Sequence, residues 1–118
     1  MTRLYIAGPC TGIPEYNAPA FDTAAEALRA AGFDVVNPIK LCRYVQKPSE
    51  ECSTEVHADY WRACMRECIQ ALVFCHGVAL LDGWEKSRGA MLETHIADTL
   101  GMRTAMVQRW LDCARCVT

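Results

Sequence analysis

The sequence predicts an α/β fold in which helices cover both faces of a parallel sheet. Short apolar segments typical of buried strands alternate with longer amphipathic segments typical of helices, and turn residues separate them. The chain has 118 residues, of which 52% are hydrophobic, and this is enough for a sizeable core. We therefore expect a single domain over residues 1–118, built as a three-layer sandwich with a four- to five-stranded parallel sheet.

The first half of the chain contains two predicted strands with a helix between them. Residues 4–7 form a short apolar strand that a Gly-Pro pair closes. The helix ends at Gly32, a residue type common directly after helices, and its apolar positions have helical spacing: Phe21, Ala24, Ala25, Leu28 and Ala31. Residues 34–37 form the second strand, which ends at Pro38.

The second half begins with a polar stretch and continues the alternation. Residues 39–56 show no periodicity, and a stretch of this length is often a functional lid; plain disorder is the equal alternative. The pattern then predicts helices over residues 58–74 and 87–100 and strands over residues 77–81 and 103–107. The C-terminal segment is expected to be helical.

Charge and hydropathy exclude two classes of function. The formal net charge is −2, so the chain lacks the clustered positive field with which proteins hold nucleic acid. The first apolar run is too short for a signal peptide, and no stretch approaches the roughly 18 apolar residues of a membrane span. We expect a cytoplasmic protein that binds neither nucleic acid nor membrane.

Eight cysteines are many for this length. A disulfide framework suits small secreted domains, whereas free buried thiols act as small hydrophobes. The second interpretation is favoured, because one predicted helical face collects Trp61, Cys64, Met65, Cys68, Leu72 and Cys75. Cys113 and Cys116 form one C-x-x-C pair, which is half a zinc site or a weak redox signal; an unstructured chain end is the simpler explanation. We expect no bound metal.

Three segments follow predicted strands, and ligands of parallel sheets bind beyond the carboxyl ends of the strands. These segments are residues 8–12, residues from Asn37 onward and residues 82–89, and we expect them to converge in one crevice. Glycines in the first segment let the backbone approach a ligand closely, and Thr11 adds a hydroxyl. An ordinary tight turn would use the same residues.

The third segment opens a helix at Ser87, a good N-cap residue. Free N–H groups and the helix dipole favour an anion at this position. Capping and phosphate binding are therefore both open to Ser87, and Arg88 could add a charged contact or lie in solvent.

Glu93 lies inside this helix at the edge of an apolar stripe formed by Leu92, Ile96 and Leu100. A solvated glutamate more often lies opposite such a stripe. Gly89, one turn earlier, would leave the surface over Glu93 open, because helical side chains lean toward the N-terminus. Glu93 is thus a candidate to reach a sugar carbon in the crevice, and an ordinary surface glutamate is the alternative.

Several segments together resemble one family. They are Tyr5-Ile6-Ala7-Gly8-Pro9, Gly12-Ile13-Pro14, Val36-Asn37-Pro38 and Leu81-Asp82-Gly83-Trp84-Glu85-Lys86-Ser87-Arg88-Gly89, followed by Glu93. They are similar to the nucleoside 2-deoxyribosyltransferase-like superfamily, including its DUF4406 branch. The Ser-x-Gly-x-x-x-Glu spacing also resembles the deoxynucleoside 5′-monophosphate N-glycosidases of that superfamily.

The resemblance implies a flavodoxin-like Rossmannoid fold, a homodimer or homotetramer, and no cofactor. It implies that Glu93 attacks C1′ of a deoxyribose as the nucleobase leaves, with water as acceptor in a hydrolase and a second base in a transferase. Ser87 would bind the 5′-phosphate, and Tyr5 and Gly8 would line the sugar and phosphate. The other expected substrate-binding residues are Pro9, Thr11, Gly12, Asn37, Gly83, Trp84 and Gly89.

One departure from the resemblance concerns the helper of the nucleophile. Relatives carry an Asp in the second long helix, where this chain has Cys68, and a second common Asp position is occupied by His76. A thiol is a poor hydrogen-bond partner. We therefore expect slow turnover, replacement of the acid by Asp82 or Glu85, or nucleotide binding alone; Asp82 is the second expected catalytic residue.

Overall fold

The computed structural model describes the backbone of residues 1–44 and 47–117 and the side chains of residues 1–41 and 47–114. Four parallel strands form its sheet in the order β2-β1-β3-β4: β1 (Arg3–Ala7), β2 (Asp34–Val36), β3 (Gly77–Leu80) and β4 (Arg103–Met106). Leu4 of β1 is in register with Val35 of β2 and Gly77 of β3. This arrangement confirms the α/β class and is flavodoxin-like.

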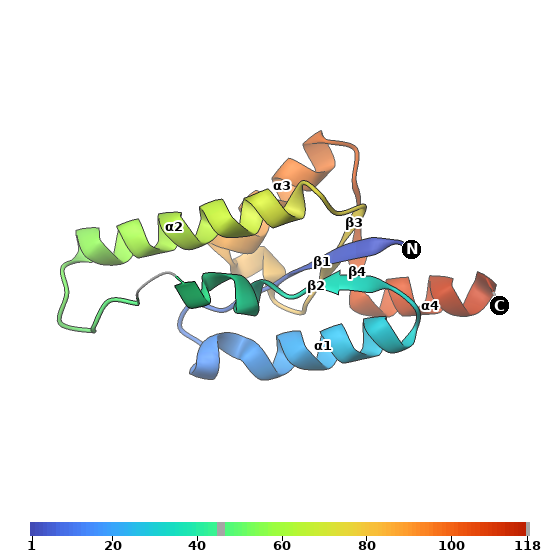
Figure 1. Ribbon diagram of the computed structural model, residues 1–118, viewed down its shortest axis with the longest axis horizontal. Helices are drawn as coiled ribbons and strands as arrows, with labels where there is room; N and C mark the ends of the chain where they lie inside the picture. The colour runs from blue at the N-terminus through green and yellow to red at the C-terminus, as the bar shows by residue number, and fades with distance from the viewer. Residues whose placement is uncertain (45–46, 118) are drawn as a thin grey trace.

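Helices cover both faces of the sheet (Figure 1). One layer contains α1 (Ala18–Ala30) and α4 (Val107–Val117), and the other contains α2 (Thr54–Leu72) and α3 (Arg88–Thr99). Three short 3-10 helices follow the strands β1, β2 and β3: η1 (Pro14–Asn17), η2 (Pro38–Tyr44) and η3 (Trp84–Lys86). Within the described part of the chain, no helix is long and apolar enough to cross a membrane.

The pleat of β1 divides the core into two clusters, because successive side chains of a strand point to opposite faces. Leu4 and Ile6 pack in the cluster under α1 and α4, together with Phe21 and Trp110. Tyr5 and Ala7 pack in the cluster under α2 and α3. The alternation therefore places the Tyr5 side chain on the same face of the sheet as α3.

The polar stretch after β2 contains more helix than the sequence indicates. Pro38–Tyr44 forms η2, and α2 begins at Thr54 rather than near residue 58. The Ser53 side chain caps α2 by accepting a hydrogen bond from the Val56 N–H at 3.3 Å. The first turn of α2 is exposed, so no apolar period marked it; residues 45 and 46 lie outside the described residues.

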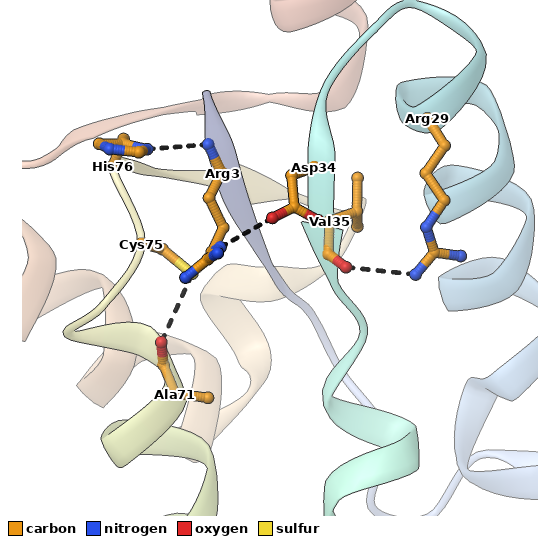
Figure 2. A network of polar contacts seen from close by, with 7 residues as sticks. All are labelled: Arg3, Arg29, Asp34, Val35, Ala71, Cys75 and His76. Carbon is orange, nitrogen blue, oxygen red and sulfur yellow. Dashed lines mark hydrogen bonds and ion pairs between the residues drawn. The ribbon is translucent and has the colours of Figure 1, made fainter. Parts of the chain in front are cut away.

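A polar network joins the amino ends of three strands (Figure 2). The Arg3 backbone N–H donates to Nδ1 of His76 at 2.8 Å, and the Arg3 guanidinium pairs with the Asp34 carboxylate at 2.8 Å. These residues stand at or next to the starts of β1, β2 and β3. His76 therefore lies at the opposite end of the strands from the loops that follow them.

Candidate functional site

A buried carboxyl and a buried phenol meet between β1 and α3. The Tyr5 hydroxyl donates a hydrogen bond to Oε2 of Glu93, and only 5% of Glu93 and none of Tyr5 is exposed. The strand pleat aims Tyr5 at α3, and Glu93 faces it from the second turn of that helix. Glu93 is therefore not a solvated surface residue. The expected apolar stripe of α3 is wrong, because Leu92 and Leu100 are exposed and small side chains, Ala90, Thr94 and Ala97, pack beside Glu93 on the buried face.

The surroundings of this pair change the protonation of both groups. Burial raises the pKa of Glu93 from 4.5 to about 8, while the Tyr5 hydrogen bond acts in the opposite direction and the neighbouring Cys68 raises this pKa further. Burial, followed by the charge of Glu93 and the effect of Cys68, raises the pKa of Tyr5 well above 10. Tyr5 thus stays a hydrogen-bond donor, whereas Glu93 changes charge near neutral pH.

Glu93 opens onto a cavity of about 760 Å³, a size typical of small-molecule sites. Its walls come from the segment after β1, from η1, from the segments after β2 and β3, and from α2, which projects beyond the carboxyl ends of the strands (Figure 1). The predicted convergence of the segments after the strands is therefore seen here. Seven of the predicted site residues line it: Tyr5, Gly8, Pro9, Thr11, Ser87, Gly89 and Glu93.

The start of α3 forms one wall of the cavity. Ser87 is its N-cap, and the Ser87 hydroxyl accepts a hydrogen bond from the Ala90 N–H at 3.2 Å. Lys86 and Arg88 line the cavity on either side of Ser87, and the Arg88 guanidinium lies 4.2 Å from the centre of the Trp61 ring. Two cations and a helix N-terminus therefore face the same space, an arrangement that favours an anion.

Two glycines permit the close packing of this wall. A Cβ on Gly8 would lie 2.7 Å from Cβ of Leu81, so β1 and the end of β3 approach each other only because this side chain is absent. A Cβ on Gly89 would lie 3.1 Å from Sδ of Met65, so Gly89 also lets α3 approach α2. Both glycines line the cavity as well.

The cavity contains three thiols, which differ from Glu93 in reactivity. Cys10, Cys64 and Cys68 line it, and burial raises the pKa of Cys10 from 9.0 to about 11. A thiol with such a pKa is protonated at neutral pH and is a weak nucleophile. The carboxyl of Glu93 is therefore a stronger candidate for chemistry than the thiol of Cys10.

The comparisons with known proteins identify a family. The model of a domain of unknown function, DUF4406, matches residues 2–106. The chain belongs to the DUF4406 family. No curated protein matches it.

Several residues expected in the site of this DUF4406 chain do not line the cavity: Gly12, Asn37, Asp82, Gly83 and Trp84. Asp82 lines a separate hollow near the start of α4. The amide of Asn37 donates to the Asp22 carboxylate at 2.8 Å and accepts from the Ile39 N–H at 3.2 Å, so it stabilises the turn into η2. Trp84 packs on the cluster under α2 and α3.

Asp82 and Glu93 thus line two different hollows, although Asp82 follows β3 directly. Leu81 packs in the cluster under α1 and α4, and Gly83 adopts a left-handed conformation with φ of 84° that turns the chain back. Glu85, the other candidate for a replacement acid, also lies outside the cavity lining. Neither of these expected replacement acids therefore lines the cavity onto which Glu93 opens.

The cysteines agree in part with the prediction. Cys68 and Cys75 are buried, and the six described cysteines are free thiols: Cys10, Cys52, Cys64, Cys68, Cys75 and Cys113. The side chain of Cys116 lies outside the described residues. Among the side chains that the structure describes, no cluster of three potential metal ligands occurs.

Among the lining residues that sequence reasoning did not propose as site residues are five polar or charged ones: Glu15, Tyr16, Lys47, Tyr60 and Lys86. Glu15 and Tyr16 belong to η1 and adopt left-handed conformations with φ of 57° and 53°, which a glutamate and a tyrosine rarely do. Lys47 comes from the aperiodic stretch after η2. For Lys47 the sequence offered only a positive charge in a polar loop, a pattern that many surface loops share.

Proposed function

We propose that this DUF4406 chain cleaves or exchanges the N-glycosidic bond of a (deoxy)nucleoside or of its 5′-monophosphate. The observation that carries the proposal is the buried Glu93 carboxyl, which Tyr5 holds at the wall of a cavity of about 760 Å³. Carboxylates of this kind attack anomeric carbons in retaining glycosidases. The resemblance to nucleoside 2-deoxyribosyltransferases adds the same role for Glu93.

The reaction proceeds in two steps with the sugar bound between the strands and α3. A carboxylate oxygen of Glu93 forms a bond to C1′ while the bond from C1′ to the base nitrogen breaks. The bonding electron pair leaves with the base, which takes up a proton. Water or a second base then attacks C1′, the ester bond breaks, and the Glu93 carboxylate is regenerated.

The start of α3 supplies the site for the 5′-phosphate. Lys86 and Arg88 provide positive charge, and the free N–H groups at Ser87 provide hydrogen bonds. We define Lys86, Ser87 and Arg88 as the phosphate subsite. Glu93 lies in the second turn of the helix that begins at this subsite and lines the same cavity, so in this proposal a sugar attached to the phosphate reaches the carboxyl.

The test is incubation with a panel of nucleosides and 5′-monophosphates, with release of the base read by chromatography. The wild type is expected to release base from at least one member, and Glu93→Gln is expected to release none. Glu85→Gln is the matched control, because Glu85 is exposed and lies outside the cavity lining. Absence of base release by the folded wild type contradicts the proposal for every compound in the panel.

A second candidate is nucleotide binding without turnover. Cys68 favours it, because this thiol lies beside Tyr5 and Glu93 where relatives carry an aspartate. Thermal stabilisation by a nucleotide, with no product and with the same stabilisation of Glu93→Gln, would select this candidate over the enzyme.

A further inference from the structure

The segments that follow β2 and β3 enter the cavity from opposite sides of β1. The sheet order β2-β1-β3 places β1 in the middle, and neighbouring strands lie about 4.8 Å apart, so the two sides are roughly 10 Å apart at the sheet. The phosphate subsite follows β3, whereas Ile39 and Lys47 follow β2. A ligand whose phosphate lies on the first side and whose sugar lies over Tyr5 extends its base toward the second.

The second side carries a cation, an anion and an aromatic ring. Lys47 Nζ lies 4.3 Å from the centre of the Tyr16 ring, and Glu15 precedes Tyr16 in η1. All three residues line the cavity. Among the described residues, neither Glu15 nor Lys47 forms an ion pair, so both charged groups can bond to a ligand.

The backbone of η1 is held in an uncommon conformation at this point. Glu15, Tyr16 and Asn17 have consecutive positive φ angles of 57°, 53° and 62°, and such residues persist where surrounding contacts impose them. One such contact is the hydrogen bond from the Asn17 amide to the Pro9 carbonyl at 2.9 Å. The fold therefore places Glu15 and Tyr16 at the cavity against the local preference of the chain.

We propose that Glu15, Tyr16 and Lys47 form a base subsite that selects a nucleobase with both an exocyclic carbonyl and an exocyclic amino group. The Lys47 ammonium donates to the carbonyl, the Glu15 carboxylate accepts from the amino group, and the Tyr16 ring packs on the base. Guanine and cytosine carry both groups, adenine lacks the carbonyl, and thymine lacks the amino group. This inference rests on the proposed function for the position of the sugar.

The base subsite also stabilises the leaving base, a task for which relatives carry an aspartate where this chain has Cys68. When the bond from C1′ to the base breaks, the electron pair and the negative charge move onto the base. The Lys47 ammonium, bonded to the carbonyl, stabilises that charge until the base takes up its proton from water. Lys47 then contributes to turnover and Glu15 chiefly to the choice of base.

Binding of the four deoxynucleoside 5′-monophosphates, measured by titration calorimetry, tests the base subsite without requiring turnover. The wild type is expected to bind the guanine or the cytosine nucleotide at least tenfold more tightly than the adenine and thymine nucleotides. Glu15→Gln and Lys47→Gln are each expected to reduce that preference at least threefold. Lys40→Gln and Glu50→Gln, charge changes in the same region outside the cavity lining, should leave it unchanged.

The outcomes separate the base subsite from the proposed function. Equal binding of the four nucleotides, or a preference that survives both substitutions, overturns the base subsite even if base is released. A preference that depends on Glu15 and Lys47, without release of base, supports the subsite and contradicts the enzyme. Failure of all four nucleotides to bind at millimolar concentration overturns the base subsite and the 5′-monophosphate form of the proposed function.

Turnover, where it occurs, distinguishes the two residues. Lys47→Gln is expected to lower kcat at least tenfold in addition to its loss of affinity, and Glu15→Gln is expected to raise KM for the preferred nucleotide with little change in kcat. Both side chains are exposed, so thermal unfolding should be unchanged. Equal effects of Lys47→Gln and Lys40→Gln on kcat would contradict the role of Lys47.

Discussion

The Tyr5 phenol donates a hydrogen bond to the Glu93 carboxyl across 88 residues of sequence. The bond connects β1, one of the two inner strands of the sheet, to the helix that begins at the phosphate subsite. It holds the carboxyl at the cavity wall and opposes the effect of burial on its pKa. Four predictions test this site, and each isolates a different interaction.

Replacement of Glu93 by glutamine is expected to stabilise the protein at high pH but not at low pH. Because burial raises the pKa of Glu93 from 4.5 to about 8, the folded chain keeps a proton between these values that the unfolded chain loses. The contribution of Glu93 protonation to the free energy of unfolding is fully present below pH 4.5 and is lost as pH rises through 8. The full shift corresponds to about 5 kcal/mol as an upper bound.

Denaturant unfolding of the wild type and Glu93→Gln at pH 5 and pH 9 measures this effect. The two proteins should have similar free energies of unfolding at pH 5, and the variant should be the more stable at pH 9. Glu85→Gln, at an exposed residue outside the cavity lining, is the control for the change in net charge. A wild type that gains stability relative to Glu93→Gln between pH 5 and pH 9 would rule out a raised pKa.

Removal of the Tyr5 hydroxyl is expected to move the pH dependence of activity upward. The hydrogen bond from Tyr5 lowers the pKa of Glu93, so the pKa in Tyr5→Phe should exceed about 8. Since the nucleophile must be ionised, the rise of kcat/KM with pH should shift to higher pH in the variant. An unchanged midpoint in a pH profile of folded Tyr5→Phe contradicts the positioning role of Tyr5.

Two substitutions of Ser87 separate capping from phosphate binding. Ser87→Ala removes the cap to the Ala90 N–H and should lower the free energy of unfolding by about 1 kcal/mol. Ser87→Asp keeps a capping oxygen and should preserve stability, but its charge would repel a 5′-phosphate. Affinity for a nucleoside 5′-monophosphate should therefore fall in Ser87→Asp while affinity for the matching nucleoside stays the same.

Alanine at the two cavity glycines should affect stability differently. At Gly8 the new Cβ would lie 2.7 Å from Cβ of Leu81, which cannot move without the backbone, so a loss of about 1–3 kcal/mol is expected. At Gly89 the nearest atom is the flexible thioether of Met65 at 3.1 Å, and alanine favours helix by about 0.5–1 kcal/mol. Urea unfolding that ranks Gly89→Ala below Gly8→Ala contradicts this steric argument.

Local patterns predicted the parts of the site that depend on short stretches of sequence. Ser87 is the N-cap of α3 as expected. Glu93 is buried, but not beside the expected stripe, because the inner face of α3 consists of Ala90, Glu93, Thr94 and Ala97 and leaves Leu92 and Leu100 exposed. The alternation of strands and helices likewise predicted the parallel sheet and the convergence of Gly8 and Ser87 at its carboxyl edge. The N-cap and the sheet therefore follow from local spacing, whereas the buried face of α3 does not.

The tertiary structure decided which of the candidates share one space. Asp82 lines a second hollow rather than the cavity, and the left-handed η1 brings Glu15 and Tyr16 to the cavity beside Lys47. The conformation of η1 has no spacing signal, because glutamate and tyrosine rarely adopt positive φ. The sequence by itself determined the fold class and the carboxyl of Glu93, whereas packing determined the partner Tyr5, the raised pKa and the residues that face a bound base.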